Sequence, residues 1–284
     1  MLERVDRVQL VVSDRQAAAR TFGEVLGAQP VREAKSAYLG ATRLVLALGS
    51  SEVELCEPSG PGPAAEHLGA QGEGLMTAGF STRDMAALRA NLERHGCRFA
   101  SEDAQVYLEP SETLGMRVVV TPDAARPQVG LVKHLYEVTN TLISDWRAAA
   151  GRYTRIFGLD PSRFSPIASE RFGYVGTLAL FNPKDGLDRI EISQVTDAKS
   201  AMGRWVAKRG DSLYMCYVEA DDLRPIIERL TARGARFTPR GPDPATERDG
   251  LWVHPGALCG LLLGVSRTTV GWEWSGQPAR VTTL

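Results

Sequence analysis

The segment HLGAQGEGLMTAGFSTRDMAALRANLERHGCRF covers residues 67–99, and WVAKRGDSLYMCYVEADDLRPIIERLTARGARF covers residues 205–237. The two segments align without a gap, and their shared glycines, charged residues and apolar residues coincide. The matched positions are Gly72 with Gly210, Leu75 with Leu213, Asp84 with Asp222, Gly96 with Gly234, Arg98 with Arg236, and Phe99 with Phe237. A gapless internal repeat of this kind predicts that one structural unit occurs more than once in the chain.

Two further repeats extend this one toward both ends of the chain. SDRQAAARTFGEVLGAQP (13–30) matches SDWRAAAGRYTRIFGLDP (144–161), and YLEPSETLGMRVVV (107–120) matches WVHPGALCGLLLGV (252–265). The stretch between the copies, TPDAARPQVG, is rich in Pro, Ala and Gly, as linkers are. We therefore expect a first domain at 1–122, a second at 132–267 and a C-terminal tail at 268–284.

Each predicted domain divides again into two similar units. Residues 5–12 form an apolar, β-branched strand, residues 14–26 have helical apolar spacing, and strands follow at 38–49 and 51–58. The order repeats with a strand at 75–82, a helix at 83–95 and strands at 97–100, 105–110 and 116–122. The predicted fold is therefore α+β, built from four β-α-β-β-β units.

This order of elements resembles the vicinal oxygen chelate superfamily, which includes glyoxalase I, methylmalonyl-CoA epimerase, extradiol dioxygenases, 4-hydroxyphenylpyruvate dioxygenase and the bleomycin-resistance proteins. The segment GPAAEHLGAQGEGLMTAGFSTRDMAAL (62–88) is the most specific part, because it is similar to the epimerase segment that leads into a GEGxHHxAF strand. The resemblance implies two tandem domains with open, cup-shaped mixed sheets. It leaves open how the four units pair, and it does not give a function, since one fold hosts many chemistries.

The resemblance also implies four metal-binding positions in each domain. They correspond to Arg7, Glu54, Thr77 and Val119 in the first domain, and to His134, Glu191, Met215 and Gly264 in the second. A catalytic divalent metal needs three or four N or O donors, and neither set supplies them. We therefore expect no metal and no other cofactor. The first domain is interpreted as a degenerate copy with a structural Arg7–Glu54 ion pair.

The second domain is the better candidate for a ligand cup. Alternation along its strands places a polar and aromatic set on one face, which is unusual for a pure core. His134 and Glu191 are predicted as an acid/base pair, with a relic hydrogen-bonded pair as the alternative. The predicted substrate-binding residues are Tyr136, Arg189, Met215, Tyr217, Glu219 and Trp252.

Two functional hypotheses follow from this cup. The first is a metal-independent isomerase or lyase that acts beside a carbonyl, in which His134 or Glu191 moves a proton and Arg189 or Tyr217 holds the oxyanion. The second is a sequestering protein of the resistance type, whose main contacts are aromatic. A metal-dependent dioxygenase or glyoxalase with non-standard ligands, drawn from Glu219, His254 or Cys216, is the third hypothesis.

Composition limits the partners and the compartment. A formal net charge of −1 and the lack of a basic run give no reason to expect nucleic acid or a membrane surface. The four cysteines show no CxxC spacing, and the start of the chain has no signal-peptide pattern, so we expect a cytoplasmic protein. The expected partner is a small organic ligand, and the chain would be a monomer or a homodimer. Trp272 and Trp274 are expected on one side of an extended tail, which would cover a cup, cover an oligomer interface or be a loose end.

Overall fold

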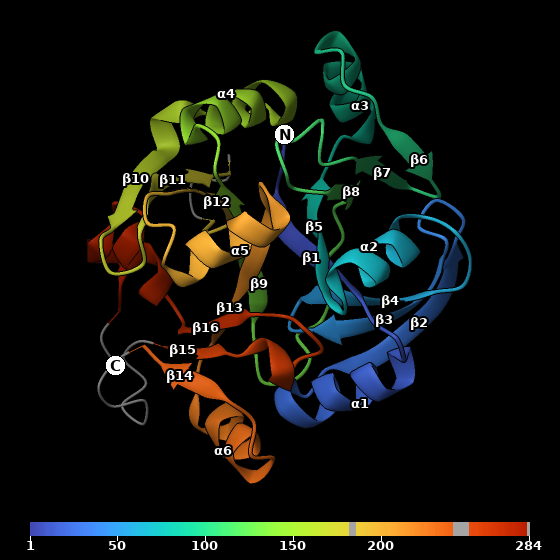
Figure 1. Cartoon of the computed structure of the whole chain (residues 1–284), viewed down its shortest axis with the longest axis vertical. Coiled ribbons are helices and arrows are strands. Elements are labelled where there is room, and N and C mark those ends of the chain that lie inside the picture. The colour runs from blue at the N-terminus through green and yellow to red at the C-terminus, as the bar shows by residue number, and fades with distance from the viewer. Residues whose placement is uncertain (182–185, 241–249, 283–284) are drawn as a thin grey trace.

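The computed structural model describes residues 1–181, 186–240 and 250–282. These residues form two eight-stranded mixed sheets, one from each half of the chain (Figure 1). The N-terminal sheet has the order β2 (Gln29–Ser36), β3 (Ala41–Leu48), β4 (Ser51–Pro58), β1 (Arg4–Val11), β5 (Gly74–Thr82), β8 (Val118–Pro122), β7 (Gln105–Leu108), β6 (Ala100–Glu102). The C-terminal sheet has the order β10 (Phe164–Ser169), β11 (Tyr174–Leu180), β12 (Arg189–Val195), β9 (His134–Leu142), β13 (Ser212–Ala220), β16 (Leu263–Arg267), β15 (Gly250–Val253), β14 (Phe237–Pro239).

The strand order settles how the four units pair. Strand β1 pairs with β5 and strand β9 pairs with β13, both antiparallel, so the first unit joins the second and the third joins the fourth. Both sheets mix parallel and antiparallel pairs, and the predicted α+β class of four β-α-β-β-β units is confirmed. The crosswise pairing of the second unit with the third does not occur.

The helices begin and end where local chemistry allows. The Asp14 carboxylate accepts hydrogen bonds from the first backbone N–H groups of α1 (Arg15–Leu26), and Gly27 ends the helix at φ 74°. The other helices are α2 (Pro63–Gln71), α3 (Met85–Arg94), α4 (Trp146–Phe157), α5 (Ala201–Arg209) and α6 (Arg224–Ala232). No helix among the described residues is long and apolar enough to cross a bilayer.

Two local expectations were wrong. The sequence reading missed β2 as a separate strand, because its exposed, polar residues lack the apolar alternation of a half-buried strand. The strand expected at 97–100 lies at Ala100–Glu102, since Cys97 continues the turn after α3 and donates its N–H to the Leu92 carbonyl.

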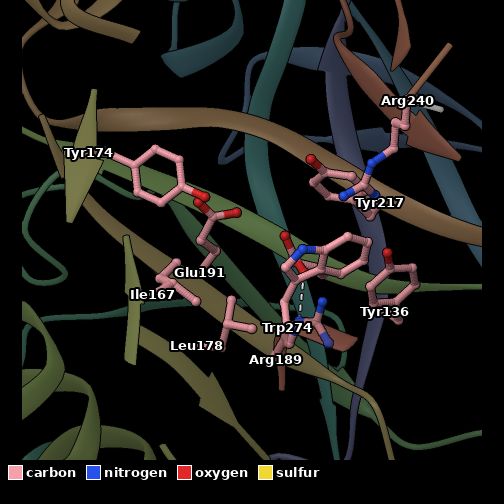
Figure 2. A pocket seen from close by; sticks show the side chains of 10 residues that line it. Tyr136, Ile167, Tyr174, Leu178, Arg189, Glu191, Tyr217, Arg240 and Trp274 are labelled. Carbon is pink, nitrogen blue, oxygen red and sulfur yellow. Dashed lines mark hydrogen bonds and ion pairs between the residues drawn. The ribbon is translucent and has the colours of Figure 1, made fainter. Parts of the chain in front are cut away.

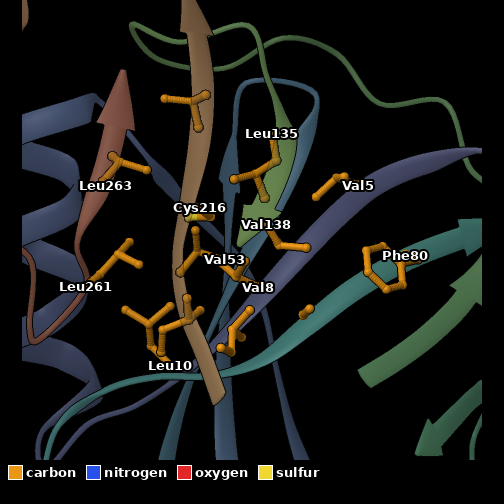
Figure 3. Packing of buried hydrophobic residues seen from close by; sticks show 14 of the residues in the cluster. Val5, Val8, Leu10, Val53, Phe80, Leu135, Val138, Cys216, Leu261 and Leu263 are labelled. Atoms are coloured by element: carbon orange, nitrogen blue, oxygen red, sulfur yellow. The ribbon is translucent and has the colours of Figure 1, made fainter. Parts of the chain in front are cut away.

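The two sheets share one apolar core. Side chains of β1 and β5, such as Val8 and Phe80, pack in the same cluster as Leu135, Val138 and Cys216 of β9 and β13 (Figure 3). Helix α1 packs against α6, and α3 packs against α4. Both of these contacts join a helix of the N-terminal half to a helix of the C-terminal half. The opposite face of each sheet is free of this core, and we call these the N-terminal and C-terminal cup faces.

Candidate functional site

A β-bulge occurs at the same place in the central strand of both sheets. In the C-terminal sheet Glu137 pairs with Tyr217 and Leu135 pairs with Val218, which leaves Tyr136 as the extra residue. In the N-terminal sheet Asp6 is the extra residue. A bulge breaks the two-residue alternation, so Tyr136 and Glu137 both line one cavity on the C-terminal cup face.

The bulge also sets which residues correspond in the two halves. Arg7 lies beside Glu52 on the neighbouring strand, and Glu137 lies beside Arg189, so the charges of this cross-strand pair are exchanged. Both pairs form buried ion pairs, Arg7 with Glu52 at 2.9 Å and Arg189 with Glu137 at 2.6 Å. The residue that corresponds to Arg7 is therefore Glu137, and its alignment with His134 was wrong.

Glu54 and Glu191 occupy equivalent positions but have different surroundings. In the N-terminal sheet the carboxylate of Glu54 accepts hydrogen bonds from Arg7 (2.6 Å), Gln9 (2.8 Å) and Arg43 (3.2 Å). Burial alone would raise the pKa of Glu54, but the two guanidinium groups outweigh burial and lower it. Glu54 is therefore a buried, compensated anion, and the predicted Arg7–Glu54 ion pair is present at 2.6 Å.

Glu191 lacks such cations. The position that corresponds to Arg43 is Gly176, and Arg189 is committed to Glu137. The carboxyl group of Glu191 instead accepts hydrogen bonds from Thr139 (3.0 Å) and Ser193 (2.5 Å), and it also shares a hydrogen bond with Glu137. Burial, and then the charge of Glu137, raises the pKa of Glu191 to about 8. The pair of carboxyls thus holds one proton near neutral pH.

The cavity beside this pair has a volume of about 60 Å³. Figure 2 shows the Tyr174 ring pointing its hydroxyl toward the Glu191 carboxyl, with Trp274 and Arg240 across the cavity. Its lining residues are Tyr136, Glu137, Ile167, Tyr174, Leu178, Arg189, Glu191, Tyr217, Arg240 and Trp274. Aromatic walls with a few convergent charged groups are typical of a small-molecule site.

Arg240 and the aromatic residues form one stack at the rim of the cavity. The guanidinium carbon lies 4.0 Å from the ring centre of Trp274, 5.1 Å from Trp252 and 5.7 Å from Tyr217. The Trp252 indole N–H donates to the Tyr217 hydroxyl at 3.0 Å. Among the residues that the structure describes, no carboxylate lies within ion-pairing distance of Arg240, whereas Arg189 forms an ion pair with Glu137 at 2.6 Å.

The C-terminal tail covers this face. Its 3₁₀ helix η4 (Val270–Trp274) buries Trp272, and the carbonyl of Gly271 and the hydroxyl of Ser275 accept hydrogen bonds from Arg189 at 2.9 and 2.6 Å. Arg189 is therefore a structural link between Glu137 and the tail. The expectation of an extended tail was wrong, since η4 is helical. Of the three roles left open, the tail takes that of a cup cover.

The structure brings together only part of the predicted site. Tyr136, Arg189, Glu191 and Tyr217 line the cavity, and Trp252 contacts it through Tyr217. Met215 pairs with Thr139 across the strands and does not line the cavity.

His134 is not brought to Glu191. It pairs with Glu219 at the start of β9, five residues before the Thr139 that lies beside Glu191, which is roughly 16 Å along a strand. Burial lowers the pKa of His134 to about 4, so its 3.9 Å contact with Glu219 is not an ion pair at neutral pH. Glu219 accepts the backbone N–H of Thr269 and so also belongs to the tail junction.

Glu137, Tyr174, Arg240 and Trp274 were absent from the predicted site. The sequence feature that could have indicated Glu137 as a site residue is its charge within a mainly buried strand. No local pattern marks Arg240, because it lies just after β14, at the edge of the C-terminal sheet.

Comparisons with known proteins agree with this architecture. Residues 6–113 match the family described as the Glyoxalase/Bleomycin resistance protein/Dioxygenase superfamily. A variant of 4-hydroxymandelate synthase from Streptomyces coelicolor shares the fold over 94% of this chain and 93% of its own, with a TM-score of 0.69 and 15% identity. Residues 6–113 thus resemble this superfamily, and the solved structure shows that the fold itself extends over nearly the whole chain.

Two further solved structures cover about half of the chain. Methylmalonyl-CoA epimerase from Mycobacterium tuberculosis is 21% identical over 43% of this chain and 89% of its own, with a TM-score of 0.40. A variant of the Streptomyces coelicolor epimerase with 2-nitronate-propionyl-CoA is 20% identical over 44% of this chain and 100% of its own, with a TM-score of 0.41. A search of curated proteins found no significant match.

The residues at the superfamily's metal positions do not fit a divalent cation. On the N-terminal cup face Glu54 is flanked by two guanidinium groups, which repel a cation, and Thr77 and Val119 add no strong donor. On the C-terminal cup face the strands offer Glu137 and Glu191 beside Met215 and Gly264. Within the described parts of the chain, no three His, Cys, Asp or Glu side chains converge as a metal site would require.

Proposed function

We propose that this protein catalyses proton transfer beside a carbonyl group, as an isomerase or lyase, in the cavity of the C-terminal cup face. The observation that carries the proposal is the buried carboxyl pair of Glu137 and Glu191 in a cavity with aromatic walls and two arginines. The role first assigned to His134 passes to Glu137 and Glu191, because these two carboxyls meet the cavity and the imidazole does not.

Each residue of the cavity would have its own role in the proton transfer. Glu191 in its carboxylate form would take a proton from the carbon next to the carbonyl, and its acid form would return the proton. A pKa near the working pH is the most effective for a group that must do both. The Tyr217 hydroxyl accepts the Trp252 N–H, so its own hydrogen is left to donate to the developing enolate oxygen. Arg189 holds Glu137 in an ion pair at 2.6 Å and so positions that carboxylate beside Glu191.

Exchange of carbon-bound hydrogen for deuterium tests this proposal without knowledge of the physiological product. The wild-type protein in D₂O is expected to catalyse exchange at the carbon next to the carbonyl of a small carbonyl compound, followed by proton NMR. Glu191→Gln should slow the exchange by roughly 100-fold or more, since a positioned acid/base contributes about 10²–10⁴.

Glu54→Gln is the matched control, because Glu54 holds the equivalent position on the N-terminal cup face. It is expected to keep the exchange activity, and a melting curve for each variant reports its folding. The proposal would be wrong if the wild type exchanged no hydrogen in any of a panel of small carbonyl compounds. It would also be wrong if the wild type and Glu191→Gln exchanged at equal rates.

Sequestration of a ligand is the second candidate, and the stack of Arg240 on three aromatic rings favours it. Such a stack supplies binding energy without chemistry. Saturable binding of a ligand by a wild type that catalyses no exchange would support this function in place of catalysis.

A further inference from the structure

We infer that the ligand of the C-terminal cup is a short-chain monocarboxylate with a carbonyl group, and that Arg240 binds its carboxylate. This inference deepens the proposed function and rests on it for the position of the carbonyl. The argument uses the charges around the cavity, the donors that remain available there, and the space.

The charge balance of the cavity favours a single negative charge. Glu137 and Arg189 cancel each other at 2.6 Å, and Glu191 is neutral while it holds the shared proton. The tyrosines that line the cavity, Tyr136, Tyr174 and Tyr217, have raised pKa values because of burial and stay neutral. Arg240 then gives the site a net charge of about +1 among the described residues, which one carboxylate would neutralise.

The donors of Arg240 are the ones still available to a ligand. Arg189 gives the hydrogen bonds of its Nε and Nη1 atoms to Glu137, Gly271 and Ser275, and its charge is paired with Glu137. Among the described residues, Arg240 makes one side-chain hydrogen bond, to the Ser266 hydroxyl at 3.2 Å, and it stacks on Trp274 with its flat face. When a guanidinium group stacks with its flat face on a ring, the N–H groups along its edge can still donate hydrogen bonds. The two oxygens of a carboxylate are a suitable acceptor for them.

The space sets the length of the ligand. The cavity of about 60 Å³ is far below the volume of sites that hold drug-sized compounds. A cavity of this size has room for only a small molecule, so it favours a short-chain ligand. Glu191 lies across this space from Arg240 (Figure 2), which places the carbon next to the carbonyl near the acid/base group when the carboxylate meets Arg240.

Titration with pyruvate tests the inference, with acetone as the neutral analogue. Calorimetry or ligand-observed NMR is expected to show saturable binding of pyruvate to the wild type and much weaker binding of acetone. Arg240→Gln should weaken pyruvate binding by roughly 10- to 100-fold, because hydrogen bonds to charged groups contribute that much. Arg240→Lys keeps the charge and should lose less, which guards against a folding defect in the Gln variant.

Arg209→Gln is the matched control, since Arg209 also stacks on an indole, Trp205 at 3.8 Å, but lies outside the cavity. It should bind pyruvate as the wild type does. No pyruvate binding by the wild type, or equal binding by Arg240→Gln, would overturn the inference.

The same variants separate this inference from the proposed function. Pyruvate binding that depends on Arg240 without any deuterium exchange would uphold the inference and reject the catalytic proposal. Exchange on acetone and pyruvate alike, unchanged in Arg240→Gln but lost in Glu191→Gln, would reject the inference and uphold catalysis.

Discussion

Glu54 and Glu191 are the same type of residue, but their surroundings shift the pKa of the carboxyl group in opposite directions. Both are buried glutamates at the same place in a repeated sheet, next to the central strand. Two arginines hold Glu54 ionised, whereas Glu191 faces a second carboxylate and keeps a proton. The arginine of the cross-strand pair lies on β1 in the N-terminal half and on β12 in the C-terminal half. The pKa is accordingly lowered for Glu54 and raised for Glu191.

The affinity for pyruvate should depend on pH in a defined direction. Below a pH of about 8 Glu191 is protonated and does not repel an anion, so affinity is expected to be constant from pH 6 to 7. Above pH 8 Glu191 ionises beside Glu137, and affinity should fall by up to about tenfold per pH unit. Arg189 keeps its charge over this range because its pKa is raised by Glu137, and Tyr174 and Tyr217 stay neutral because burial raises their pKa values.

Titrations of Glu191→Gln give the matching readout. The amide cannot ionise, so this variant should bind pyruvate with an affinity that does not change from pH 6 to 9. A wild-type affinity that rises or stays level above pH 8 would contradict the shared proton.

At the scale of single elements, the sequence was informative wherever the chain obeys a regular period. The helix α1 was predicted to within a residue because Asp14 caps it and Gly27 ends it at positive φ. The site was harder to predict, because the bulge at Tyr136 puts two successive residues on one face and defeats alternation. His134 was chosen for its chemistry, although its place at the start of β9 keeps it from the cavity.

The tail is an element whose role only the tertiary structure reveals. Trp272 is 5% exposed and packs with Tyr136 and the leucines of β11, under the stacked side chain of Arg280. The sequence offered two tryptophans but no indication of the surface that they would meet. The contact of η4 with Arg189 shows that the tail belongs to the cup and not to a loose end.

Trp272→Ala should therefore destabilise the protein. Removal of a buried Trp side chain costs about 3–5 kcal/mol, and the loss would loosen the tail from Arg189. Urea unfolding measures the change, and Glu273→Ala, on the exposed side of the same helix, should stay within about 0.5 kcal/mol of the wild type. Equal stability of the two variants would mean that the tail does not pack on the cup in solution.

At the scale of the whole molecule, the two halves meet with an approximate twofold relation. Gly115 abuts the backbone of Asp211, and its repeat counterpart Gly260 abuts the backbone of Glu73. The Glu24–Arg233 ion pair joins α1 to α6, and Asn91 of α3 donates to two carbonyls at the end of α4. The buried Asp188 accepts the Val5 N–H at 2.7 Å across the same junction.

Under the proposed function, the N-terminal half has a structural role. The N-terminal cup face is filled by ion pairs and aromatic packing, and it holds the C-terminal half in place through the shared core. The repeats in the sequence predicted the duplication. They did not predict the junction between the halves. At this junction, glycines lie close to backbone atoms of residues that are distant in the sequence.

Gly260→Ala should weaken this junction. An added Cβ would lie 2.0 Å from the Glu73 carbonyl oxygen, and Gly260 has a φ of 84°, which side chains rarely adopt. We expect a loss of roughly 1–3 kcal/mol in the free energy of unfolding, with both halves losing stability together in a single transition. Gly256→Ala, four residues away, adds a methyl group where no atom lies within 4 Å, so it should stay within about 0.5 kcal/mol of the wild type. If denaturant unfolding instead gave two separate transitions for Gly260→Ala, the halves would be independent, and the support that we assign to the N-terminal half would be wrong.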